Sequence, residues 1–178
     1  VDYTSFDLAP FAMEQHDIEL VEQPLPADAL EDLRALRRMT PTPIMVDESV
    51  WSPADAWRVL RAGAADMLNV YVAEAGGVLK AMRIFEMAQL AGVQTTMGSM
   101  PELGIGTAAQ IHLGIAAPDI SFASDVCGTL YFERDIIREA LPIRDGHAYP
   151  IEAPGLGVTL DEDPVRDFSR RPASLPSA

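Results

Sequence analysis

Cysteine, basic residues and long apolar runs are scarce in this chain of 178 residues. Cys127 is the only cysteine, so no disulfide can form within the chain and we expect a reducing, cytoplasmic location. The 13 basic residues face 27 acidic ones, and a formal charge of -14 argues against nucleic acid or an anionic membrane as a partner. No apolar run reaches the roughly 20 residues of a membrane span, and no signal-peptide pattern opens the chain.

The sequence does contain a repeat of about 25 residues, in which a short apolar run is followed by a polar residue and a longer amphipathic stretch. The repeat predicts strands at Ile18–Val21, Pro43–Val46, Met67–Val72, Val93–Met97 and Ile120–Ala123. It predicts helices at Ala27–Arg38, Pro53–Ala62, Gly77–Ala91 and Gly104–Ala116. Alternating strands and helices with short links imply an α/β fold with a parallel sheet, either doubly wound or closed into a (β/α) barrel.

Two local signals refine this prediction. Ser52-Pro53 marks a helix start, because serine caps helix N-termini and proline favours the first helical position. After Asp125 the repeat breaks, and residues 131–144 are typical of an irregular arm. Asp145-Gly146-His147 then predicts a turn, followed by a stretch rich in proline and glycine.

Acidic residues stand where three of the predicted strands end. Glu22 ends the first strand, Asp47 and Glu48 follow the second, and Asp125 follows the fifth. The carboxyl ends of parallel strands form the active face of such architectures, so these acids converge. Glu22 and Asp47 are 25 residues apart, and on neighbouring strands a hard cation such as Mg²⁺ would remove their mutual repulsion. The alternative is that each acid caps a helix or is simply solvated.

Several motifs follow one another in the order and spacing of a known family. Residues 18–25 read IELVEQPL, residues 43–49 read PIMVDES, and Ala75-Gly76-Gly77 comes next. Residues 98–106 read GSMPELGIG, and residues 154–158 near the end of the chain read PGLGV. On these motifs the chain resembles the mandelate racemase/muconate lactonizing enzyme group of the enolase superfamily.

The resemblance implies a partial (β/α)7β TIM-like barrel. The chain would hold roughly the second half of the barrel strands and the C-terminal segment. Residues 1–166 would belong to the barrel domain, residues 167–178 would form a flexible tail, and the N-terminal part of the capping domain would be absent.

The resemblance also implies a metal site. Glu22 and Asp47 would bind Mg²⁺, with Mn²⁺ as a substitute, and Glu48 would be a neighbouring acid or an alternative ligand. A third ligand is expected on the preceding strand; either it is Asp2, which stands only 20 residues before Glu22, or it lies upstream of the chain. Asp125 matches the acid after the last barrel strand, where it contacts substrate or, alternatively, only forms a turn.

The chain departs from its relatives at the positions that move protons. Tyr71 stands where muconate lactonizing enzymes hold a lysine, and Gly98 stands where racemases hold a histidine. Lys80, the only lysine, falls inside a predicted helix, where we expect it on the surface. Tyr71 can act as an acid or as a hydrogen-bond donor to substrate, but a phenol with a pKa of about 10 is a poor base. A packing role for Tyr71 is the alternative.

Two functions stay open from the sequence. The first is a parent Mg²⁺-dependent lyase or isomerase, a dehydratase, cycloisomerase or epimerase, that acts on a small carboxylate through an enolate. We expect this fragment alone to be inactive. The second is a catalytically silent fragment or pseudoenzyme that keeps the barrel. Open strand edges predict a homo-oligomer or association with the missing N-terminal portion.

Overall fold

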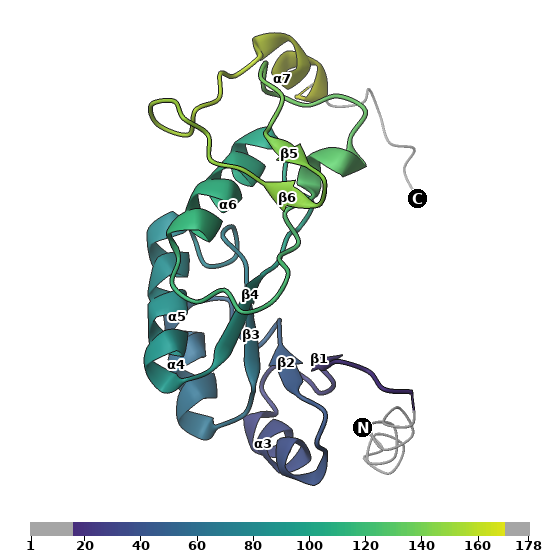
Figure 1. Cartoon of the computed structure of the whole chain (residues 1–178), viewed down its shortest axis with the longest axis vertical. Helices are drawn as coiled ribbons and strands as arrows, with labels where there is room; N and C mark the ends of the chain where they lie inside the picture. Colours follow the sequence, from purple (N-terminus) through teal and green to yellow (C-terminus); the bar gives the residue numbers. More distant parts are fainter. Residues whose placement is uncertain (1–15, 170–178) are drawn as a thin grey trace, which may run out of the picture. The chain divides into compact units, whose positions relative to one another are not determined.

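The computed structural model describes residues 16–169, and a parallel four-stranded sheet is its central feature. The strands lie side by side in chain order (Figure 1), as β1 (Val21–Glu22), β2 (Ile44–Val46), β3 (Met67–Val70) and β4 (Gln94–Met97). Every residue of β2 and β3 is buried, as expected of parallel strands covered on both faces. Parallel neighbours need a crossover connection, and helices provide it.

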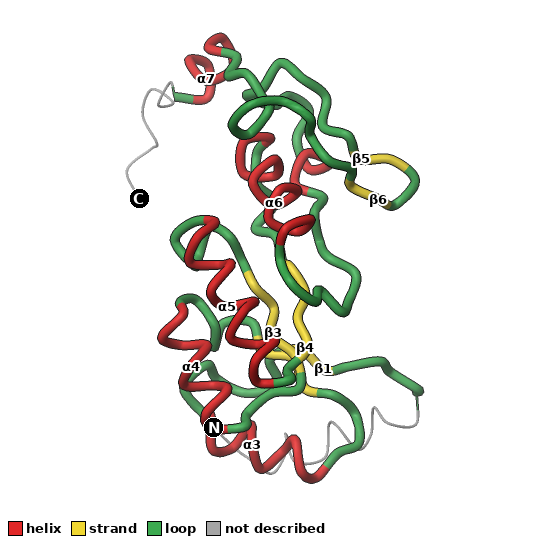
Figure 2. Tube along the Cα trace, turned by 60° about the vertical axis from the view of Figure 1, so that its left-hand side comes forward, coloured by secondary structure: helices red, strands yellow, loops and turns green. Residues whose placement is uncertain are grey.

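Three helices supply these crossovers and cover one face of the sheet (Figures 1 and 2). They are α3 (Leu30–Met39), α4 (Pro53–Ala62) and α5 (Val78–Ala91). Each turns a narrow apolar stripe inward, represented by the fully buried Leu33, Val59 and Phe85. Within residues 16–169 no helix has the length and apolar content needed to cross a membrane.

The chain divides into two compact units, and the first contains this sheet and its three helices. Among the described residues, the first unit comprises residues 16–98 and 116–125, and the second comprises residues 99–115 and 126–169. The elements of the second unit (Figure 2) are most of α6 (Gly104–Ala116), the 3-10 helix η1 (Gly128–Tyr131), β5 (Ile143–Arg144), β6 (His147–Ala148) and α7 (Glu162–Phe168).

The predicted turn in the second unit is confirmed. Asp145 and Gly146 have φ angles of 52° and 72° and join β5 to β6 in an antiparallel hairpin. α7 was not expected from the sequence, and its last two residues extend into the predicted tail. Its N-cap is Asp161, whose carboxylate accepts a hydrogen bond from the Asp163 backbone N–H.

The fifth predicted strand, Ile120–Ala123, is wrong. The segment runs beside β4, but between its two backbone hydrogen bonds to β4 it advances by four residues while β4 advances by two. The Ser121 N–H donates to the Thr95 carbonyl at 3.0 Å and the Asp125 N–H donates to the Met97 carbonyl at 2.8 Å. Between them the Thr96 hydroxyl donates to the Ala123 carbonyl at 2.9 Å, so a side chain replaces a backbone partner. This break in register prevents a regular ladder.

The helix start predicted at Ser52-Pro53 is confirmed. The Ser52 hydroxyl accepts a hydrogen bond from the Asp55 N–H at 3.2 Å and donates to the Asp55 carboxylate at 2.6 Å. The capping bond satisfies one backbone N–H that the helix itself leaves unpaired.

We predict that Ser52→Ala lowers the free energy of unfolding by about 0.5–2 kcal/mol, because α4 loses its cap. Urea denaturation measures this change, with Ser124→Ala as the matched control because Ser124 is exposed and lies outside any helix. Equal effects of the two substitutions would contradict a capping role.

Candidate active site

Glu22 and Asp47 lie at the same edge of the sheet. Glu22 is the last residue of β1 and pairs in register with Met45, while Asp47 directly follows β2. The two carboxylates, with the neighbouring Glu48, line an open hollow of about 530 Å³. Both acids therefore lie at one edge of the sheet, as their spacing in the sequence predicts for adjacent parallel strands.

The environment of Asp47 disfavours its charge. Burial, together with the negative charges of Glu48 and Glu22, raises the pKa of Asp47 to about 6. The hydrogen bond that Asp47 accepts from Tyr71 opposes both effects. Crowded carboxylates of this kind gain most from a bound cation, since a positive charge removes both the repulsion and the need for a proton.

Gln23 fixes the loop that carries Asp47. Its side-chain carbonyl accepts hydrogen bonds from the backbone N–H of Asp47 at 2.8 Å and of Ser49 at 3.3 Å. Its amide nitrogen donates to the Leu25 carbonyl at 2.8 Å and to the Ser49 hydroxyl at 3.0 Å. Sequence reasoning missed this role, although the glutamine directly follows Glu22 and so stands beside the predicted ligand.

Tyr71 and Asn69 bring hydrogen-bond donors to the two acids. The Tyr71 hydroxyl donates to the Asp47 carboxylate at 2.9 Å, and the Asn69 amide donates to the Glu22 carboxylate at 2.8 Å. Burial, followed by the bond to Asp47, raises the pKa of Tyr71 above its ordinary value, so the phenol keeps its proton. Sequence reasoning missed Asn69, although a polar residue in a buried strand, two positions before Tyr71, indicates the same face of the sheet.

The missing side chain of Gly98 leaves the space that the Tyr71 ring occupies. A Cβ atom at position 98 would lie 2.5 Å from Cζ of Tyr71 and 2.6 Å from the side-chain carbonyl oxygen of Asn69. Gly98 does not have a positive φ, so the constraint is steric and not conformational. The tyrosine that follows β3 therefore leaves no space for a side chain at position 98, where the resemblance predicts the histidine of racemases.

The remaining predicted residues lie as follows. Glu48 is exposed beside Asp47, and Asp125 is exposed beside the end of β4, where its N–H bonds the Met97 carbonyl. Lys80 is exposed in α5, as expected. Asp2 lies outside the described residues. The roles assigned to these side chains stay predictions.

The donor set at this edge fits a hard divalent cation. Carboxylate oxygens are the ligands that Mg²⁺ prefers, and Glu22 and Asp47 already crowd each other. Within residues 16–169 no three His, Cys, Asp or Glu side chains gather into a metal site, so this pair would supply two ligands of such a cation. A further ligand would come from outside the described part of the chain.

Comparison with known proteins identifies the family. Residues 9–164 match the family described as enolase C-terminal domain-like, and the chain belongs to that family. Muconate cycloisomerase 1 of Rhodococcus opacus is 40% identical over 153 residues, which are 86% of this chain and 41% of that protein. Chloromuconate cycloisomerase of Cupriavidus pinatubonensis is 31% identical over 163 residues, 92% of this chain and 43% of that protein. The chain spans about two fifths of the length of these curated relatives.

Solved structures agree with this assignment. Muconate lactonizing enzyme from Pseudomonas putida superposes with a TM-score of 0.90 at 31% identity, covering 96% of this chain and 48% of that one. A mandelate racemase/muconate lactonizing family protein from Azoarcus sp. EbN1 superposes with a TM-score of 0.89 at 32% identity, covering 98% and 49%. The predicted group and the predicted fold class, a partial TIM barrel, are confirmed.

The raised pKa of Asp47 predicts how stability depends on pH. The pKa rises from 3.8 to about 6 on folding, so the folded protein holds the proton more tightly, and ionisation of Asp47 destabilises the fold above about pH 6. In a metal-free buffer, Asp47→Asn should therefore raise the free energy of unfolding at about pH 8, and this gain should shrink towards about pH 4. Urea denaturation across this range measures it, with the exposed Glu48→Gln as a control of smaller effect. A loss of stability in Asp47→Asn at about pH 8 would contradict the account.

The contact between Gly98 and Tyr71 predicts a coupled pair. Gly98→Ala should cost about 1–3 kcal/mol, because the added methyl group overpacks the Tyr71 ring. In a Tyr71→Ala background the same substitution should cost less, because only the close contact with Asn69 remains, giving a coupling energy of about 1 kcal/mol or more in a double-mutant cycle. Additive effects of the two substitutions would show that the ring does not occupy this space.

Proposed function

We propose that this chain is the metal- and substrate-binding part of an isomerase or lyase that acts on a small carboxylate through an enolate. The observation that supports it most is the Tyr71 hydroxyl bound to Asp47, beside Glu22, at the carboxyl edge of the sheet. The relatives named above are muconate and chloromuconate cycloisomerases, so we infer cycloisomerisation as the reaction and an unsaturated dicarboxylate as the substrate class.

In this proposal Glu22 and Asp47 hold Mg²⁺, with Asp2 as the candidate third ligand. The bound cation would supply the positive charge that stabilises an enolate. Asn69 keeps the Glu22 carboxylate oriented through its amide, and Gln23 does the same for the backbone of Asp47. Both bonds fix ligand positions before the cation arrives, which lowers the cost of binding it.

Tyr71 is the proposed proton donor of this half of the site. Its raised pKa keeps the phenol protonated at neutral pH, which suits donation of a proton or a hydrogen bond and not removal of a proton. The phenol hydrogen points at Asp47 in the described structure, so it must turn from that carboxylate to reach a substrate. Asp125, exposed beside the end of β4, is proposed to contact the substrate.

The reaction class follows from what Tyr71 excludes. Epimerisation by two groups needs a proton-carrying side chain on each face of the substrate. Position 98 holds none, because the Tyr71 ring fills that space. In this proposal the ends of β3 and β4 therefore carry a proton-transferring side chain, Tyr71, on only one face of the substrate. Such an arrangement favours cycloisomerisation or elimination over epimerisation.

A second candidate is a catalytically silent protein that keeps the barrel and the cation. It is favoured by the absence of lysine from the strand ends of the described chain, where Tyr71 replaces it and Lys80 is exposed in α5. The two candidates differ in turnover and not in metal binding, so one experiment separates them.

We predict that the full-length protein containing this chain converts muconate in the presence of Mg²⁺. Tyr71→Phe should reduce turnover about 100-fold or more, because the proton donor is lost, while Mg²⁺ binding persists. Asp47→Asn should weaken Mg²⁺ binding itself. Steady-state kinetics and calorimetric Mg²⁺ titration measure both, with the exposed Tyr131→Phe as the matched control.

The outcomes separate the proposals. Wild-type protein that binds Mg²⁺ but converts no unsaturated dicarboxylate would favour the silent candidate. A Tyr71→Phe variant as active as the wild type would contradict the role of the phenol.

A further inference from the structure

The helices that cover the sheet carry a charge opposite to that of the chain. α3, α4 and α5 hold seven of the 13 basic residues and only four of the 27 acidic ones. The rest of the chain is correspondingly more acidic than its net charge of -14 suggests. A basic face on an acidic chain is electrostatically complementary to another copy of the same chain.

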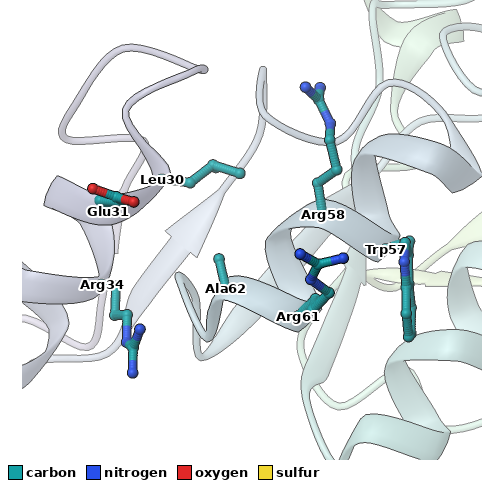
Figure 3. Close-up of a pocket in the computed structure, with 7 residues that line it drawn as sticks. All are labelled: Leu30, Glu31, Arg34, Trp57, Arg58, Arg61 and Ala62. Carbon is teal, nitrogen blue, oxygen red and sulfur yellow. The ribbon is translucent and has the colours of Figure 1, made fainter.

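A groove opens between α3 and α4 in the middle of this basic face (Figure 3). It has a volume of about 540 Å³, and Arg34 of α3 faces Trp57, Arg58 and Arg61 of α4 across it. Glu31 of α3 is the one acidic side chain in its lining, against three arginines. Arg58 pairs with Asp55. Among residues 16–169 no ion pair neutralises Arg34 or Arg61, so these two guanidinium groups remain available to an anion.

The same groove has an apolar border. Trp57 is 57% exposed and also lines a hollow of about 260 Å³ between α4 and α5, where Leu90 of α5 is 88% exposed. Tryptophan and arginine are the residue types that dominate binding energy at protein interfaces.

We propose that this groove binds the acidic helix α7 of a second copy of the chain. Asp161-Glu162-Asp163 is the only run of three consecutive acidic residues in the sequence, and Glu162 and Asp163 are exposed at the start of α7. Phe168, at the other end of the helix, is 56% exposed and offers an apolar side chain to the Trp57 border. The ion pair of Asp163 with Arg166 is exposed on both sides, so exchanging it for a groove arginine costs little.

The contact would be head-to-tail, because the groove and α7 are different surfaces of the chain. Such contacts produce closed rings or open chains of copies. The attraction rests on exposed charges, so it should weaken with salt, whereas pairing through open strand edges would not.

Sedimentation velocity of the full-length protein that contains this chain tests this proposal. At about 0.02 M salt the wild type should self-associate through this contact, and about 0.5 M salt should weaken the apparent association at least about tenfold. R34E/R61E and E162K/D163K should each lose this salt-sensitive association. Arg38→Glu is the matched control, because Arg38 is exposed on α3 but does not line the groove, and it should associate like the wild type.

Mixing the two double variants makes the test stringent. Each mixed contact again joins opposite charges, so an equimolar mixture should regain the salt-sensitive association that each variant lacks alone. A wild type whose association does not depend on salt, salt-sensitive association that survives R34E/R61E or E162K/D163K, or a mixture that does not regain it would each overturn the proposal.

Discussion

The pairing of β1 with β2 holds two carboxylates together, and the rest of the candidate site depends on that constraint. The Val21 N–H donates to the Pro43 carbonyl at 2.9 Å and the Gln23 N–H donates to the Met45 carbonyl at 2.8 Å, so the backbone ladder fixes where Glu22 and Asp47 lie. Without a cation the arrangement is unfavourable, as the raised pKa of Asp47 records. A fold tolerates such locally unfavourable carboxylate packing where a bound ligand offsets its free-energy cost.

The donors around these acids follow from the same geometry. Asn69 and Tyr71 are two positions apart at the end of β3 and therefore lie on the same face of the sheet. Each donates a hydrogen bond to one of the two carboxylates. Tyr71 lies against Gly98, so the ends of β3 and β4 are coupled by packing. If Tyr71 stands in the place of a lysine, as the resemblance predicts, this exchange affects the neighbouring strand end as well as the proton-transfer group.

Much of this arrangement was predictable from the sequence. The bounds of α4 and α6 were predicted correctly, and for α4 the Ser52-Pro53 pair is a strong local signal of the helix start. The acids at the ends of β1 and β2 were predicted from spacing. The strand at Ile120–Ala123 was wrong, because its register depends on Thr96, a residue far away in the sequence. The bond between Tyr71 and Asp47 joins residues 24 apart, so no local pattern indicates it.

The central claim, that Glu22 and Asp47 share one divalent cation, is tested most directly by anomalous diffraction from crystals of the protein grown with Mn²⁺. The account predicts a single manganese peak within coordination distance of an oxygen of each carboxylate, about 2.0–2.6 Å. A peak that contacts only one of the two, or a well-ordered pair with no peak between them, would contradict it.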